Sequence, residues 1–152
     1  MQTWITQHPA LLWLIIPGYP IALFFGVAAG ISYIGGWSAL AKQFRLESAF
    51  NGPRWNMQSG HMRGIAGYNN CLTVGCSPEG LYIAMIPFFR FRHPPLLVPW
   101  HEINVSRRKI IFWDYVRLGL GRELNIPFFV RPKLAENLRL VAGDRWPTEL
   151  VI

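Results

Sequence analysis

Residues Leu11–Ile34, LLWLIIPGYPIALFFGVAAGISYI, contain no Asp, Glu, Lys or Arg, and the first charged side chain of the whole chain is that of Lys42. A helix of this length is about 36 Å long and crosses the hydrocarbon core of a bilayer, about 30 Å thick, with some tilt. A signal peptide would begin with basic residues, and the core helix of a soluble protein would be shorter and have a polar face. The segment therefore predicts a transmembrane helix.

The flanks of this segment support that prediction. Amphipathic rings favour the membrane–water interface, and four aromatic residues lie near its two ends: Trp4, Trp13, Tyr33 and Trp37. Pro17 and Pro20 predict a kink in its first half.

Charge predicts the orientation. No Lys or Arg precedes the segment, whereas Lys42, Arg45 and Arg54 follow it. The positive-inside rule places the N-terminus outside and the C-terminal bulk in the cytoplasm.

Cys71 and Cys76 agree with a reducing compartment, because two residues five apart on one strand point to opposite faces and make a poor disulfide. We expect buried or half-buried structural thiols rather than a metal site.

One face of the segment carries small residues. Ala22, Gly26 and Gly30 recur every four residues, and residues 26–30 fit the G-x-x-x-G pattern that lets helices approach closely in lipid. Self-association through this face and the ordinary abundance of Gly and Ala in membrane helices explain the pattern equally well.

The rest of the chain predicts one domain after a short connection. Residues 1–36 form the N-terminal flank and span, 37–53 a juxtamembrane segment, 54–143 a mainly β domain, and 144–152 a tail. Trp37, Leu40 and Phe44 recur at helical spacing. They fit either a continuation of the membrane helix, which we favour slightly, or a separate amphipathic helix on the membrane surface.

From Arg54 onward the apolar pattern alternates, which is typical of strands. About six antiparallel strands are expected, among them 81–86, 96–103, 109–118 and 124–130, with a turn at Ser77–Gly80. The end of the chain predicts a helix that begins at Pro132, buries Leu134, Leu138 and Val141, and ends at Gly143. Strand–helix–strand units are absent from this pattern, so we expect an antiparallel sheet in an α+β or mainly β fold.

Two stretches carry a resemblance to a known family. Pro78-Glu79-Gly80-Leu81-Tyr82 and the strand Leu96–Ile103, with Pro99-Trp100, resemble the GRAM-like and bacterial branch of the pleckstrin-homology (PH) superfold. The resemblance covers roughly residues 54–143 and implies a meander of strands with one helix packed against its open end. It also implies a bacterial inner-membrane protein with a single span, and it implies no particular ligand.

Two basic stretches are candidate contact sites for a membrane or partner. The first is the proline-bounded loop with Phe88, Phe89, Arg90, Phe91 and Arg92. Its rings can enter the headgroup layer while its arginines meet lipid phosphates. The alternative, slightly favoured, is a strand pair with its phenylalanines in the domain core. The second stretch is Arg107-Arg108-Lys109.

Enzymatic and nucleic-acid functions are not expected. The chain has no Gly-rich phosphate loop or His-Glu-x-x-His motif, and His101 and Glu102, adjacent on an expected strand, would point to opposite faces. The net charge of +7 fits an anionic leaflet better than nucleic acid, because the leaflet is the nearer anionic partner of a membrane-tethered domain. The aromatic residues Trp100, Phe112 and Trp113 are expected to serve the core rather than to stack on bases.

The sequence therefore predicts a membrane-anchored binding or scaffold protein, without catalytic residues, cofactor or metal. Its expected partners are anionic lipid headgroups or a membrane protein. The alternative is a small accessory subunit of a larger membrane complex.

Overall fold

The structure is a computed structural model that describes residues 9–63, 66–90 and 92–150, with side chains from Gly18 onward except that of Phe89. Trp4 and the side chain of Trp13 lie outside the described residues.

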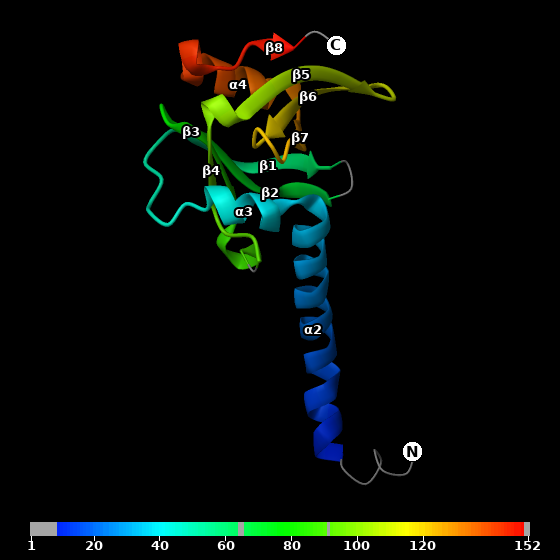
Figure 1. Cartoon of the computed structure of the whole chain (residues 1–152). Helices are drawn as coiled ribbons and strands as arrows, with labels where there is room; N and C mark the ends of the chain where they lie inside the picture. The colour runs from blue at the N-terminus through cyan, green and yellow to red at the C-terminus, as the bar shows by residue number, and fades with distance from the viewer. Residues whose placement is uncertain (1–8, 64–65, 91, 151–152) are drawn as a thin grey trace.

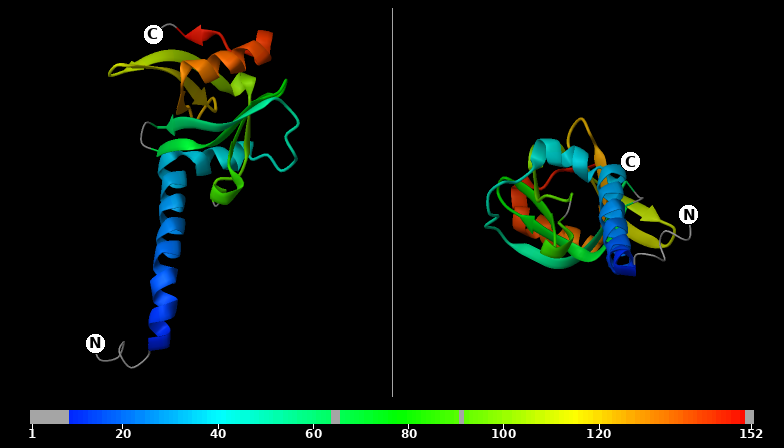
Figure 2. Two further views of the ribbon diagram at one scale, coloured as in Figure 1. Left: turned by 180° about the vertical axis from the view of Figure 1, so that it is seen from behind. Right: turned by 90° about the horizontal axis from the view of Figure 1, so that it is seen from below.

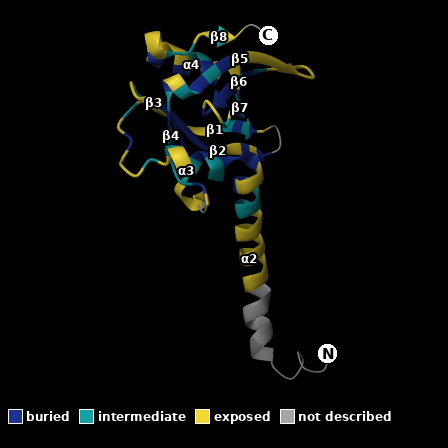
Figure 3. Cartoon of the chain, in the orientation of Figure 1, coloured by how far each residue is buried: buried dark blue, intermediate teal, exposed yellow. Residues whose placement is uncertain are grey.

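The apolar segment forms one long helix, α2 (Pro9–Gly35), which projects from the folded domain (Figure 1). The helix continues through Pro17 and Pro20. Its residues Gly18–Gly35 are long and apolar enough to cross a membrane. Residues 18–27 of this helix are exposed (Figure 3), and they include the large apolar side chains of Ile21, Leu23 and Phe25. The predicted N-terminal helix with the length and composition of a membrane span is therefore present.

A separate helix, α3 (Trp37–Phe44), follows α2 after one residue. That residue, Gly36, has φ +89°, and a Cβ there would lie 2.8 Å from the Cδ1 atom of Ile126. Glycine adopts this left-handed conformation without steric cost. The favoured interpretation of residues 37–44 as a continuation of the span is therefore wrong. The chain turns at Gly36 and buries Trp37 and Leu40 completely, so Trp37 belongs to the domain core rather than to an interfacial belt.

Eight strands form one sheet in the order β4-β3-β2-β1-β7-β6-β5-β8. All neighbouring strands are antiparallel except β5 and β8, which are parallel. The meander β1–β4 lies next to α2 and the meander β5–β7 lies farther from it (Figure 2). The strand bounds are β1 (Arg54–Met62), β2 (Ala66–Cys76), β3 (Gly80–Met85), β4 (Leu96–Pro99), β5 (Ile103–Ile110), β6 (Trp113–Leu120), β7 (Ile126–Val130) and β8 (Glu149–Leu150).

Two of the expected strands are divided in the structure. The expected strand 96–103 is divided by a 3-10 turn, η2 (Trp100–Glu102), and the expected strand 109–118 is divided by the hairpin turn between β5 and β6. The turn at Ser77–Gly80 closes the β2–β3 hairpin as predicted, with the Ser77 N–H donating to the Gly80 carbonyl at 3.0 Å.

The predicted C-terminal helix is α4 (Pro132–Ala142). Leu134 and Leu138 are buried as expected, but Val141 is 46% exposed. Gly143 ends the helix at φ +58°, and its N–H donates to a carbonyl of the last turn. A 3-10 turn, η3 (Gly143–Arg145), then leads into β8.

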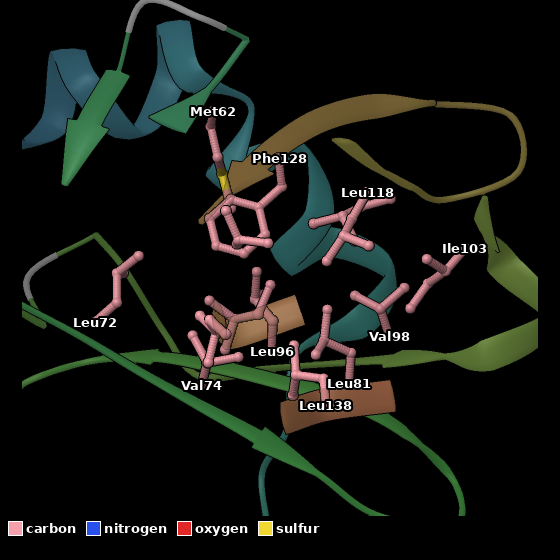
Figure 4. Packing of buried hydrophobic residues seen from close by; sticks show 14 of the residues in the cluster. Met62, Leu72, Val74, Leu81, Leu96, Val98, Ile103, Leu118, Phe128 and Leu138 are labelled. Atoms are coloured by element: carbon pink, nitrogen blue, oxygen red, sulfur yellow. The ribbon is translucent and has the colours of Figure 1, made fainter. Parts of the chain in front are cut away.

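Apolar side chains from both meanders, α3 and α4 meet in one core (Figure 4). Its largest fully buried members include Trp37, Leu40, Met62, Leu72, Leu81, Leu118, Phe128 and Leu138. Because α3 supplies two of them and β8 pairs with β5, the packed unit extends beyond residues 54–143 at both ends.

Candidate functional site

The loop between β3 and β4 lies at the end of the domain from which α2 leaves (Figure 1). Its first part is a 3-10 turn, η1 (Pro87–Phe89), not a strand. Phe88 is 81% exposed, and its ring centroid lies 6.4 Å from that of Phe24 on α2. The strand-pair alternative is therefore wrong for this part of the loop, because Phe88 lies beside the apolar helix and outside the core. Phe91 and the side chain of Phe89 lie outside the described residues.

Two hydrogen bonds fasten the second half of the loop to the helices. The Ser32 hydroxyl donates to the Arg92 carbonyl at 2.6 Å, and the Trp37 Nε1–H donates to the Pro94 carbonyl at 2.9 Å. Arg92 itself has φ +59°. Backbone carbonyls are strong acceptors that require partners when buried. These bonds hold the loop between α2 and α3.

Among the described residues of this loop, His93 is buried. It is 2% exposed, and its Nε2 atom lies 3.2 Å from the hydroxyl of Tyr68. Its ring packs at 5.0 Å, centroid to centroid, against Trp37. The imidazole packs between the rings of Trp37 and Tyr68 and so orders the loop. This packing fixes the backbone from which the neighbouring side chains extend.

A basic pocket opens between this loop and α3. It has a volume of about 670 Å³, and its four charged lining residues are all cations: Lys42, Arg45, Arg90 and Arg92. Uncharged residues complete the lining: Ser38, Ala41, Pro94 and Pro95. The four cations come from two segments that are separated by more than forty residues of sequence and joined by the Leu46 N–H, which donates to the Pro95 carbonyl at 2.9 Å.

The four cations are exposed, and none of them forms an ion pair with a carboxylate of the described residues. The ion pairs among the described residues are His101–Glu102, Arg107–Glu149 and Arg139–Glu136, all outside the pocket. The Arg90 Nε–H donates to the Met85 carbonyl at 3.1 Å, which fixes the base of that side chain's guanidinium. Guanidinium groups bind phosphate oxygens in a bidentate manner, so the pocket has the chemistry of a phosphate site.

A smaller apolar cavity of about 250 Å³ lies between α2 and β2. Tyr68 and Cys71 line it with residues of α2. Burial raises the pKa of the Tyr68 hydroxyl, and the neighbouring Cys71 raises it further. Burial also raises the pKa values of the Cys71 and Cys76 thiols. These groups are therefore neutral at physiological pH and act as packing groups, as expected for the two cysteines.

The second basic stretch lies elsewhere. Arg107, Arg108 and Lys109 are on β5, in the meander that is farther from α2 (Figure 2). The Arg107 guanidinium donates to both carboxylate oxygens of Glu149, at 3.0 and 3.2 Å. The structure therefore does not bring this stretch together with the β3–β4 loop.

His101 and Glu102 differ from the expectation. They lie on η2 rather than on a strand, and His101 Nε2 is 3.8 Å from Glu102 Oε1, so the two side chains do not point to opposite faces. Glu102 Oε2 instead accepts a 2.6 Å hydrogen bond from the Arg122 N–H, which fixes a turn. Within residues 9–63, 66–90 and 92–150, no three His, Cys, Asp or Glu side chains form a group that could hold a metal ion.

In the sequence, Lys42 and Arg45 indicate the orientation of the span, and nothing in it links them to Arg90 and Arg92. The positions of these residues in the sequence do not predict that the two pairs of cations lie close together, because the turn at Gly36 is what brings α3 beside the loop. Comparison of the chain with models of protein families, with curated proteins and with solved structures gave no match.

Proposed function

We propose that this protein is a single-pass membrane protein whose domain binds anionic phospholipid headgroups in the basic pocket. The observation that carries the proposal is the cluster of four cations beside the end of the apolar helix. If α2 crosses a bilayer, the pocket lies at the level of the headgroups.

The length of α2 supports insertion. Its 27 residues correspond to about 40 Å of helix, against about 30 Å of hydrocarbon. Tyr33, 79% exposed, lies in its last turn, where an amphipathic ring suits the interface.

The distribution of charge supports an orientation with the N-terminus outside and the domain in the cytoplasm. All fifteen Lys and Arg residues follow the span. Basic segments near a span favour the cytoplasmic side, and the anionic leaflet there attracts them. We assign the protein on this basis, and on its resemblance to bacterial PH-like proteins, to a bacterial inner membrane.

The fold supports the PH-like assignment. Two antiparallel meanders joined through β1 and β7, followed by a helix packed on the core, correspond to the arrangement that the resemblance implies. Because the fold does not determine the ligand, the headgroup proposal depends on the pocket alone.

Two kinds of contact act together at this surface. A basic side chain near an anionic leaflet contributes about 1 kcal/mol. Phe88, exposed beside α2, can enter the headgroup layer and bury apolar surface. The attraction orients the domain and recruits anionic lipid to one place next to the span.

The test uses the full chain in detergent, because Trp37 and Leu40 belong to the core and a truncated domain would lose them. Native mass spectrometry measures the binding of short-chain phosphatidylglycerol and phosphatidylcholine. We expect phosphatidylglycerol to bind more tightly. Arg90→Gln with Arg92→Gln should weaken its binding by roughly 30-fold, the equivalent of two lost charges, and added salt should weaken it in the wild type.

The matched control is Arg131→Gln with Lys133→Gln, which removes two exposed cations near the start of α4. This variant should bind phosphatidylglycerol like the wild type. Equal binding of the two lipids, or equal losses in the two double variants, would contradict the proposal.

A further inference from the structure

The tip of the β5–β6 hairpin is an exposed apolar surface. Ile110 pairs with Trp113, which leaves Ile111 and Phe112 as a two-residue turn. The exposed fractions of Ile111, Phe112 and Trp113 are 79%, 86% and 71%. The expectation that Phe112 and Trp113 serve the core is therefore wrong. Contiguous exposed apolar side chains usually mark a contact surface.

The backbone of the tip is strained. Ile111 has φ +60°, a conformation that glycine adopts readily and that is an outlier for a β-branched residue. Strain of this kind persists at sites where the side chain has another role. An isoleucine at this position therefore indicates a function for its apolar side chain outside the fold of the single chain.

The hairpin reaches out past α2 on the side away from the β3–β4 loop (Figures 1 and 2). The sheet that carries the hairpin is connected to the end of α2 just after β1, where the Arg63 Nη1–H donates to the Ile34 carbonyl at 3.1 Å. The tip belongs to the meander β5–β7, which is farther from α2. It therefore lies to one side of the helix, beyond the end at which α2 enters the domain.

The same side of α2 carries its small residues. Phe24, Val27, Ala28 and Ile31 line the cavity against β2 and so face the domain. At 3.6 residues per turn, Ala22, Gly26 and Gly30 lie on the opposite side of the helix. A Cβ at Gly26 or Gly30 would meet no atom within 4 Å. One neighbour placed beside α2 would meet both the hairpin tip and this helix face.

We infer that this neighbour is a second copy of the chain, with the two hairpin tips in contact across a two-fold axis parallel to α2. Both copies enter the membrane in the same direction, so the tips lie at the same height. Near its tip, each hairpin carries the carboxylate of Asp114 beside the cations Arg108 and Lys109. Lys109 lies opposite Asp114 in the register, and a second copy can set its carboxylate against the cation of the first.

The hairpin tips alone do not supply the area of a stable interface, so the interface also requires the α2 faces. Buried aromatic side chains cover about 150–250 Å² each. Phe112 and Trp113 from two copies therefore supply roughly 600–1,000 Å², less than the ~1,200–2,000 Å² of a stable interface. The hairpin contact defines the dimer, and close packing of the α2 faces completes it.

The inference rests on insertion of α2 in a membrane, which the proposed function includes, and it is independent of headgroup binding. The test is disulfide cross-linking of the full chain in membranes, with Phe112→Cys in a Cys71→Ala, Cys76→Ala background. Mild oxidation should give a species of twice the chain mass. Leu140→Cys, 70% exposed on α4 at the far end of the domain, is the control and should stay monomeric. No dimer from Phe112→Cys, a product with a different protein, or equal yields at both positions would overturn the inference.

A second variant tests the contact without cross-linking. Ile111→Gly with Phe112→Asn removes the apolar tip and suits the left-handed backbone. It should raise the dissociation constant of the dimer in detergent at least tenfold, with an unchanged or higher unfolding temperature. An unchanged dissociation constant would overturn the inference. Phosphatidylglycerol binding, measured on the same samples, should be unaffected by this variant. The dimer and the headgroup site therefore have separate measurements, and the failure of one proposal is distinguished from the failure of the other.

Discussion

The hydroxyl of Ser32, in the last turns of α2, donates a 2.6 Å hydrogen bond to the backbone carbonyl of Arg92 in the β3–β4 loop. Ser32 is completely buried. Since its single proton is used there, the Ser38 hydroxyl, 2.9 Å away, donates to the Ser32 oxygen. The apolar helix, α3 and the loop of the basic pocket are thus connected through one side chain.

Ser32→Ala should therefore loosen the loop. The change leaves the Arg92 carbonyl and the Ser38 hydroxyl without this partner, which costs about 1–3 kcal/mol in a buried environment. We expect a lower unfolding temperature and weaker phosphatidylglycerol binding, both measured on the full chain in detergent. Ser48→Ala, at an exposed serine, is the control and should change neither. Wild-type values for Ser32→Ala would show that the bond does not position the pocket.

Trp37 distinguishes a core helix from a membrane-surface helix at residues 37–44. Because Trp37 is fully buried, Trp37→Ala should destabilise the domain by about 3–5 kcal/mol. Trp37→Phe keeps a buried ring and loses the hydrogen bond to Pro94, so its effect should be smaller. Chemical denaturation in detergent measures both. If Trp37→Ala unfolds like the wild type, Trp37 does not contribute to the core and a position at the lipid interface is supported instead.

The prediction of the fold from sequence succeeded where the signal is local. The long apolar segment, the turn at Ser77–Gly80 and the helix between Pro132 and Gly143 each follow from residues close together in the chain. The position of α3 depends instead on one backbone angle at Gly36 and on long-range contacts of Trp37.

The candidate site and the hairpin also depend on contacts between residues that are far apart in the chain, which the sequence does not predict. The pocket combines α3 with a loop more than forty residues away, and no local pattern reports that contact. Phe112 and Trp113 have the composition of a core strand, but the hairpin extends beyond the core before they are reached. Apolar composition identifies residues that favour burial, and only the tertiary fold decides whether the same chain buries them.

Stability should fall at alkaline pH because of the cysteines. Burial raises the pKa values of Cys71 and Cys76, so the folded state holds their protons more tightly than the unfolded state. Their contribution is fully present below the ordinary thiol pKa of about 8.5 and is lost as the pH rises through the higher folded values. We expect the unfolding temperature to fall as the pH rises above about 8.5. The fall should be shallower in a Cys71→Ala, Cys76→Ala variant, and equal slopes would exclude the thiols as its cause.

The depth of the β3–β4 loop in a bilayer tests most directly whether the basic pocket lies at the headgroups beside a membrane-spanning α2. A fluorophore is attached to Phe88→Cys in the cysteine-free background and compared with one at Leu140→Cys in vesicles that contain phosphatidylglycerol. We predict that nitroxide-labelled headgroups quench the label at position 88 strongly and that aqueous iodide quenches it weakly, with the reverse at position 140. Equal quenching at the two positions by both agents would contradict the placement of the basic pocket at the headgroups.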